Sequence, residues 1–164
     1  MPNSRLDETD RRILRELQAN GRMSNQELSE VVGLSPSPCL RRVKQLEADR
    51  VIEGYVALVD PHALGLDVSA FVRVRLSQQD DHHLALFEEA VGRFPEVMEC
   101  YLMTGESDYQ LRVLVPSLQA FEDFLRDKLT AVAGVSQIQT SFALRPVVYR
   151  TAIPITAPAR GSGA

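Results

Sequence analysis

Cysteine and histidine, the side chains that most often hold metals or serve as nucleophiles and bases, are scarce in this chain. The only cysteines are Cys39 and Cys100, which lie far apart in the sequence. We therefore expect no disulfide and interpret both as small buried hydrophobes or free thiols. The histidines are His62 and the adjacent pair His82 and His83, whose side chains diverge on a helix and cannot chelate one ion as an i, i+4 pair does. No metal site is predicted.

Catalytic motifs are also missing. The sequence has no glycine-rich phosphate loop, no nucleophile elbow and no Cys/His pattern with zinc spacing. We predict no catalytic residues and no cofactor, and we do not expect an enzyme.

Long apolar runs and an excess of positive charge are absent as well. No apolar stretch approaches the 18 residues of a membrane span, and the first ten residues lack the apolar core of a signal peptide, so we expect a cytoplasmic protein with no membrane partner. The net charge is −4, and residues 1–60 hold nine Lys and Arg against ten Asp and Glu. Because neither half of the chain is basic, any nucleic-acid footprint must be a local patch.

Two helix starts lie close together between residues 24 and 46. Ser24 followed by Glu27 is a capping box, and Gly33 stops the helix that it opens. Ser35 followed by Pro36 opens a second helix with an N-cap hydroxyl and a proline at the position that needs no amide hydrogen. Two short helices joined by a glycine-containing turn indicate a helix-turn-helix, which reads DNA with its second helix.

The second helix has two distinct faces. An apolar stripe, expected to be buried, contains Cys39, Val43 and Leu46 with Leu40 beside them. The opposite side carries three cations and no carboxylate before Glu47, which suits a phosphate-lined groove. A solvated basic face is the alternative for such a run. The two-helix context favours DNA, with these candidate contacts: Ser24, Asn25, Ser35, Ser37, Arg41, Arg42 and Lys44.

The second half of the chain alternates strand and helix patterns. Strands are predicted over 68–76, 97–104, 109–115 and 135–143, and helices over 84–94 and 118–132. The order βαββαβ predicts a ferredoxin-like domain, an antiparallel sheet covered on one side by two helices. The predicted fold class is therefore α+β, with an N-terminal winged helix-turn-helix domain and a C-terminal ferredoxin-like domain.

Four segments follow from these patterns. We predict a helix-turn-helix domain over 1–52, a linker strand or wing over 53–66, a sensing and oligomerisation domain over 67–152, and a disordered tail over 153–164. Ala70, Val72 and Val74 should face the helices together with alternate residues of the third strand. The other side of these two strands is a mixed face that we interpret as a subunit interface, with a partly solvated face as the alternative; its residues are Phe71, Arg73, Arg75, Gln110, Arg112 and Leu114.

The two halves together resemble the Lrp/AsnC family of feast/famine transcriptional regulators. LDETDRRILRELQANGRMSNQELSEVVGLSPSPCLRRVKQLE resembles the DNA-binding head of that family, GYVALVDPHALG its linker, and VMECYLMTGESDYQLRV with AGVSQIQTSFAL its ligand-sensing domain. The resemblance implies a homodimer that assembles into tetramers or octamers, with an amino-acid effector bound where dimers meet. It also implies control of amino-acid metabolism.

The same resemblance supplies the candidate effector site. It implies Gly105, Glu106 and Asp108 in the turn after the second strand, with Tyr101 and Met103 leading in and Thr140 on the last strand. A free amino acid needs acceptors for its ammonium group, amides for its carboxylate and a side-chain pocket. For Asp108, a turn-capping role is the alternative.

This chain departs from the family at two positions. Family members more often carry aspartate where Glu106 stands, and commonly glycine where Arg50 stands, at the end of the recognition helix. Either Arg50 adopts the left-handed conformation that suits glycine, or the helix ends differently.

As a regulator of this family, the protein should place two recognition helices in successive major grooves of a pseudo-palindromic operator. The rival function is an architectural protein that wraps double-stranded DNA without an effector.

Overall fold

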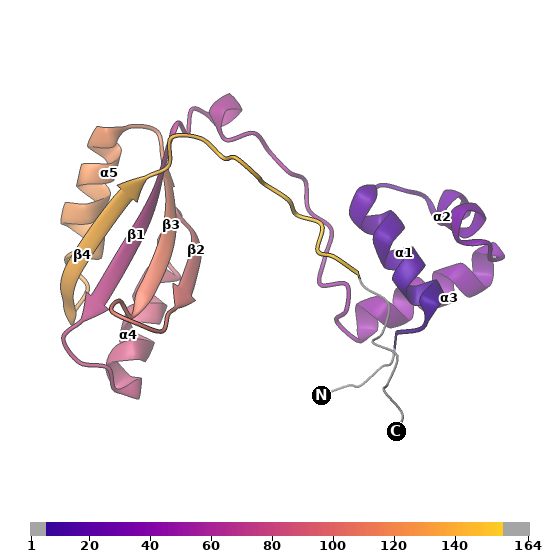
Figure 1. Cartoon of the computed structure of the whole chain (residues 1–164), viewed down its shortest axis with the longest axis horizontal. Helices are drawn as coiled ribbons and strands as arrows, with labels where there is room; N and C mark the ends of the chain where they lie inside the picture. The colour runs from indigo at the N-terminus through magenta and orange to yellow at the C-terminus, as the bar shows by residue number, and fades with distance from the viewer. Residues whose placement is uncertain (1–5, 156–164) are drawn as a thin grey trace, which may run out of the picture. The chain divides into compact units, whose positions relative to one another are not determined.

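A computed structural model describes residues 6–155 (Figure 1). Their contacts divide the chain into two units. One unit contains residues 6–58 together with 148–155, and the other contains residues 59–147. The chain therefore passes from one unit to the other twice.

The first unit, here called the head, is built on three helices: α1 (Glu8–Ala19), α2 (Asn25–Val32) and α3 (Pro36–Ala48). The capping box predicted at Ser24 is present, because its amide donates to Glu27 Oε2 at 2.7 Å and its Oγ accepts from the Glu27 amide at 3.2 Å. A second capping box joins Asp7 and Asp10 at the start of α1. Gly33, with φ of 73°, ends α2 as expected.

The start of α3 differs from expectation in one respect. Ser35 has the backbone conformation of an N-cap, yet its hydroxyl makes no capping hydrogen bond. An N-cap side chain accepts from the amide of the second or third helical residue. Pro38 holds the third position and has no amide hydrogen, so one of the two possible donors is absent.

The end of α3 settles the question raised by Arg50. Arg50 has φ of 54°, the left-handed conformation in which glycine is favoured. Its amide donates to the carbonyl of Glu47 at 3.0 Å, and the amide of Val51 donates to that of Leu46 at 2.9 Å. This pair of bonds is a Schellman motif with Arg50 in the glycine position.

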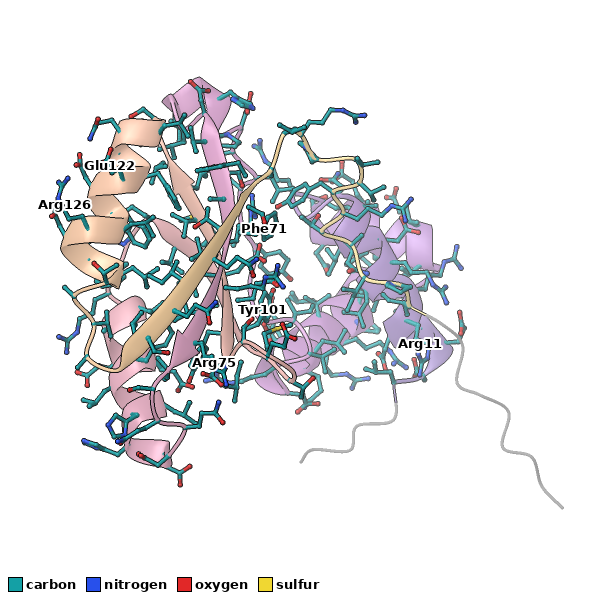
Figure 2. All side chains as sticks on the ribbon, turned by 60° about the vertical axis from the view of Figure 1, so that its left-hand side comes forward. Arg11, Phe71, Arg75, Tyr101, Glu122 and Arg126 are labelled. Atoms are coloured by element: carbon teal, nitrogen blue, oxygen red, sulfur yellow. The ribbon has the colours of Figure 1, made fainter. Side chains whose placement is uncertain are left out.

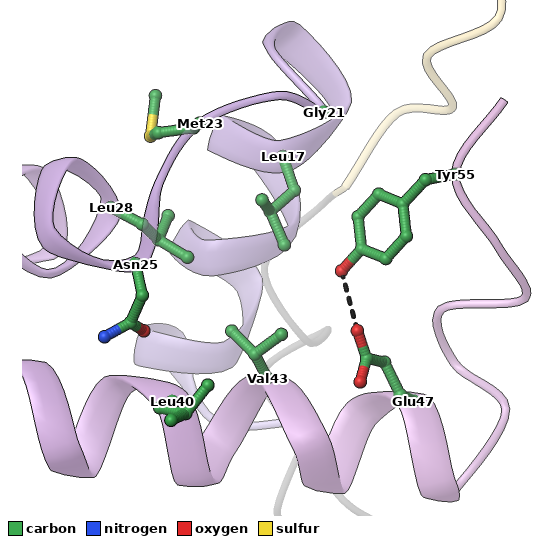
Figure 3. Close-up of a pocket in the computed structure, with 9 residues that line it drawn as sticks. All are labelled: Leu17, Gly21, Met23, Asn25, Leu28, Leu40, Val43, Glu47 and Tyr55. Atoms are coloured by element: carbon green, nitrogen blue, oxygen red, sulfur yellow. Dashed lines mark hydrogen bonds between the residues drawn. The ribbon is translucent and has the colours of Figure 1, made fainter. Parts of the chain in front are cut away.

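The head core contains most of the predicted apolar stripe. Cys39 and Leu46 are buried with Ile13 and Leu28. Leu40 is not buried as predicted: it is 42% exposed and lines an open groove (Figure 3). The reason is geometric, since a helix buries a stripe and residue 40 lies at the edge of the stripe that Cys39 centres.

The predicted wing or linker strand does not form in the described chain. Residues 53–60 have no regular structure, and His62–Leu64 forms a short 3-10 turn. The valines and leucine of this segment favour strand, but a strand needs a neighbour for its amides and carbonyls. No described segment pairs with it.

The second unit is the predicted ferredoxin-like domain. Its elements occur in the order βαββαβ, and the four strands form one antiparallel sheet in the order β2-β3-β1-β4, so that β2 and β4 are the edges. The elements are β1 (Val68–Leu76), α4 (Asp81–Val91), β2 (Val97–Leu102), β3 (Tyr109–Val115), α5 (Leu118–Phe124), a π-helical turn (Leu125–Leu129) and β4 (Val135–Phe142).

The predicted division of the sheet into two faces is confirmed. The helix-facing residues of β1 and β3 are fully buried: Ala70, Val72, Val74, Leu111, Val113 and Val115. Between them, the alternate residues are exposed or half-buried, and Phe71 keeps 39% of its surface exposed.

The segment that follows β4 returns to the head. Residues 148–155 group with the three helices, and Ile153 forms two hydrogen bonds with Gln18. The tail predicted over 153–164 lies outside the described residues from position 156 onward.

Both cysteines are free, one in each unit. Among residues 6–155, no helix combines the length and apolarity required to cross a membrane.

Replacing Arg50 by glycine should stabilise the head. Removing the Cβ relieves the left-handed conformation, and we expect the free energy of unfolding to rise by about 0.5–1 kcal/mol. Urea unfolding followed by circular dichroism measures the change. Arg50→Ala is the control, because alanine keeps the Cβ; an equal gain in both variants would show that the backbone conformation is not the cause.

Candidate functional site

The exposed side of α3 carries an unpaired basic row. Ser37, Arg41 and Lys44 follow one another at helical spacing, and all are exposed. Within the described chain, neither Arg41 nor Lys44 forms an ion pair or a side-chain hydrogen bond. Free cations on an outward helix face are available to phosphates or base edges.

The start of α3 exposes two serine hydroxyls but only one free backbone amide. Pro36 and Pro38 have no amide hydrogen, so Ser37 alone supplies a free backbone donor in this turn. The hydroxyl of Ser35 is not used for capping and is exposed. A partner approaching this end therefore meets two serine hydroxyls and one amide.

Arg42, one position beyond Arg41, is paired within the head. Its guanidinium contacts Asp7 Oδ2 at 2.7 Å and Asp10 Oδ1 at 2.8 Å, which joins α3 to the start of α1. The backbone amide of Asp10 and then the Arg42 guanidinium hold the pKa of Asp7 below its usual value. Both carboxylates contact Nη1 of Arg42 and offset its charge, and a phosphate contact by this residue stays a prediction.

Two other predicted contacts are engaged in holding the motif together. Ser24 is occupied by its capping box, with its hydroxyl 2.7 Å from Glu27 Oε2. Asn25 donates from its side-chain amide to the carbonyl of Pro36 at 2.9 Å, which fixes the start of α2 against the start of α3. The bond from Asn25 to Pro36 links the two helices of the motif, while the Ser24 box acts within α2.

In the second unit, the predicted effector turn joins β2 to β3. Tyr101 is paired in register with Gln110 and lies on the uncovered face, 55% exposed. Met103 and Glu106 are also exposed, and Gly105 has φ of 115°, a conformation that side chains disfavour.

Asp108 is committed to the fold. Only 8% of this residue is exposed, and its carboxylate accepts hydrogen bonds from the Leu76 amide and from Gln79 Nε2, both at 2.7 Å. These bonds fasten the β2–β3 turn to the end of β1. With both oxygens engaged, the observed contacts favour the turn-holding alternative over direct contact with an effector.

Thr140 lies far from the turn within the sheet. It sits on edge strand β4, paired with Val72, and therefore faces the covered side. Tyr101 lies on the opposite edge strand and the opposite face. One chain therefore does not bring the predicted effector residues into a single site.

The uncovered face carries the charge and aromatic groups that the sequence predicted. Figure 2 shows Phe71, Arg75 and Tyr101 on the side of the sheet away from α5. The Arg112 guanidinium is paired with Glu99 at 2.9 Å, and Tyr101 donates to the same carboxylate at 3.3 Å. Arg73 and Arg75 have no side-chain partner in the described chain.

An open groove of about 310 Å³ between α4 and β2 was not predicted from the sequence. It is lined by Glu88, Cys100 and Tyr109 with apolar neighbours, and the tyrosine hydroxyl donates to Glu88 at 2.8 Å. Cys100 is exposed at the surface, and partial desolvation together with nearby Glu88 raises its pKa to about 11. The positions of these residues in the sequence do not indicate that they lie close together in the fold.

No cluster of three or more potential metal ligands occurs among residues 6–155.

The chain is similar to known regulators over almost its full length. Residues 69–153 match the family model of the Lrp/AsnC ligand binding domain, and residues 6–53 match a model of winged helix-turn-helix DNA-binding domains. The Bkd operon transcriptional regulator of Pseudomonas aeruginosa is 45% identical over 92% of this chain and 98% of its own. The leucine-responsive regulatory protein of Escherichia coli is 41% identical over 89% of each chain.

Solved structures agree with these relatives. A transcriptional regulator of Neisseria meningitidis in complex with L-methionine superposes with a TM-score of 0.86 and 43% identity, covering 91% of this chain and 96% of that one. E. coli AsnC superposes with a TM-score of 0.83 and 28% identity, covering 90% and 98%.

The contrast between Arg41 and Arg42 is testable by stability. Arg42→Gln leaves two neighbouring carboxylates without their cation, and we expect the free energy of unfolding at pH 7 to fall by about 1 kcal/mol, a modest value because the pair is partly open to water. Arg41→Gln is the matched control and should stay within about 0.5 kcal/mol of wild type. Urea unfolding compares them; equal losses would contradict the assignment.

The same pair predicts an acid dependence. Since the folded-state pKa of Asp7 is lowered below 3.8, its contribution to stability is complete above that value and is lost as the pH falls through the lowered pKa. The stability difference between wild type and Arg42→Gln should therefore narrow below pH 4. A difference that stays constant down to pH 2.5 would contradict this origin.

Proposed function

The chain belongs to the Lrp/AsnC family of transcriptional regulators, with a helix-turn-helix DNA-binding domain and a ligand-binding domain, and on this basis we propose that it is an amino-acid-responsive regulator of amino-acid metabolism. Its relatives are regulators and not enzymes. We assign its site of action to the cytoplasm, where its DNA target lies.

The observation that carries the DNA-binding part is the unpaired basic row on α3. Arg41 and Lys44 are exposed and have no side-chain partner among residues 6–155, while the neighbouring Arg42 is paired with two carboxylates. Arg41 therefore belongs to a surface that is open to DNA. Its neighbour Arg42 belongs to a contact that holds α3 against α1.

We assign roles on α3 accordingly. Ser35, Ser37 and Arg41 contact base edges or nearby phosphates at the N-terminal part of the helix, and Lys44 contacts the DNA backbone. Arg42 positions α3 against α1. Ser24 and Asn25 set the geometry of the turn, and their contact with DNA is at most peripheral.

Paired heads compensate for the small size of this patch. The head has no net positive charge in its sequence, so one copy supplies few phosphate contacts. A homodimer raises the effective concentration of the second head once the first is bound. Two copies of α3 then occupy successive major grooves of a pseudo-palindromic operator.

The uncovered sheet face is our candidate for the dimer contact, with further assembly into tetramers or octamers. Its exposed Phe71 lies among Arg73, Arg75 and the Glu99–Arg112 pair. An apolar centre with charged groups around it suits an interface that buries a core inside a polar rim.

The effector site that we propose is shared between chains. Tyr101, Met103, Gly105 and Glu106 come from one copy, with Asp108 shaping their turn, and Thr140 comes from another. The placement of Tyr101 and Thr140 on opposite edges supports this, because only a second chain can bring the two together. The L-methionine complex of the Neisseria regulator supports an amino acid as the ligand.

An effector in such a site changes DNA binding by binding one assembly state better than another. A ligand shared between chains contacts residues that come together in that state and not in others, which gives it a differential affinity. Occupancy of the operator then follows the amino-acid concentration.

The alternative is an architectural protein that wraps DNA and ignores small molecules. Isothermal titration against the twenty amino acids separates the two functions. We expect at least one of them, with L-methionine and L-leucine tested first, to bind the assembled protein. If none of the twenty amino acids binds, the architectural function is favoured.

Salt dependence tests the assignment on α3. Arg41→Gln and Lys44→Gln should each reduce the slope of log binding constant against log salt by about one. The control, Arg93→Gln in the turn after α4, should keep the wild-type slope. Gel filtration must show unchanged assembly in all variants. An unchanged slope and affinity in Arg41→Gln would overturn the placement of this residue.

A further inference from the structure

Both chain segments that connect the two units are fastened to the same part of the head. The chain leaves the head after residue 58 and returns at residue 148. The first segment follows Tyr55, a head residue that bonds to α3, and the second includes Ile153, which bonds to Gln18. Their contacts meet at the C-terminal turn of α1 and the glycine that follows it, residues 17–21, here called the α1 node.

Tyr55 joins the first segment to both the α1 node and the recognition helix. Its hydroxyl donates to Glu47 Oε1, in the last turn of α3, at 3.0 Å (Figure 3). Its ring lies against Gly21, where an added Cβ would be 3.7 Å from the ring. With Leu17 and Val43 it lines the open groove of about 210 Å³.

The environment of Tyr55 indicates a defined position. The residue is 50% exposed, yet burial of its hydroxyl end and the bond to Glu47 raise its pKa to about 12. The linker therefore begins with a side chain held between α1 and α3.

Gln18 joins the second segment to the node by a reciprocal pair of bonds. Its Nε2 donates to the carbonyl of Ile153 at 3.1 Å, and its Oε1 accepts from the amide of the same residue at 2.8 Å. A side-chain amide carries one donor group and one acceptor side by side, as a neighbouring strand would present them. Glutamate keeps only the acceptor, and alanine keeps neither.

The second segment leads directly from β4. Thr140, assigned to the effector site, lies eight residues before Val148, where the chain rejoins the head. The first segment leads directly to β1, the strand that pairs with β4. Within one chain, these two segments are the covalent connections from β1 and β4 to the head.

We propose that the α1 node is the interaction surface at which the ligand-binding unit acts on the DNA head, and that Gln18 and Tyr55 are the positioning residues that transmit effector binding to α3. The occupant of the surface is segment 148–155 of the same chain, which the two Gln18–Ile153 bonds place there. This role rests on the proposed amino-acid control.

Hydrogen exchange tests the docking independently of any effector. The assembled full-length protein is measured by mass spectrometry with fragmentation that resolves the Ile153 amide. Gln18→Ala should raise exchange at Ile153 by about fivefold to tenfold, as expected for loss of one hydrogen bond. Gln18→Glu should keep most of the protection because its carboxylate still accepts.

Two controls make this result specific. Gln26→Ala removes an exposed glutamine of α2 that bonds only Glu30, and it should leave Ile153 unchanged. The amide of Ile13, in the head core, should stay protected in every variant, which excludes unfolding as the cause. Rapid exchange at Ile153 in the wild type, or no change in Gln18→Ala, would overturn the docking.

The effect of amino acids on DNA affinity tests whether Gln18 and Tyr55 transmit effector binding to α3. DNA affinity is measured with and without L-methionine, and again with L-leucine, on a duplex selected from a randomised library with the wild-type protein. In the wild type, the ratio of DNA affinity with amino acid to DNA affinity without it measures the effector response. Gln18→Ala and Tyr55→Phe should each bring this ratio at least threefold closer to one. Their DNA affinity without amino acid, and their affinity for the amino acid alone, should stay within twofold of wild type.

The outcomes separate the two levels of the proposal. A wild-type ratio in both variants overturns transmission through the node. If amino acids bind but leave the DNA affinity of the wild type unchanged, or if none binds, the proposed amino-acid control fails and transmission fails with it. Exchange at Ile153 then still decides whether the segment docks.

Discussion

Burial of one side of the two central strands is the constraint on which the rest of the ligand-binding unit depends. The alternating small and branched residues of β1 and β3 must face α4 and α5, and this fixes the side on which every other residue of the sheet lies. It places Tyr101 on the open face and Thr140 on the covered one. The division of these residues between two faces follows from this packing, and their division between two edges follows from the strand order β2-β3-β1-β4. The proposed site therefore requires a second chain.

The parts that the sequence predicted well are those in which a local pattern has one solution. The Ser24–Glu27 box, the stop at Gly33 and the alternation along β1 are all determined by near neighbours, and all are confirmed. The left-handed Arg50 was one of two open alternatives, and the structure resolves it. The predicted linker strand does not form, because a strand needs a pairing partner and the composition of the segment does not show whether one exists.

Long-range side-chain contacts were outside the reach of such patterns. The sequence shows Arg41 and Arg42 as equal members of a basic run, and only folding brings Asp7 and Asp10 to one of them. Asp108 likewise looks like an exposed turn residue until the end of β1 arrives beside it. Charge on a helix is therefore a poor guide to DNA contact until the carboxylates of the neighbouring helices are placed.

The bond between Gln18 and Ile153 has a consequence for synthesis. The two residues are 135 positions apart, and the whole ligand-binding unit is translated between them. At a ribosomal rate of about 5–20 residues per second, the three helices wait on the order of ten seconds for their last contact. A nascent chain interrupted before residue 153 can thus form the DNA-reading helices while lacking the fastening that completes the head.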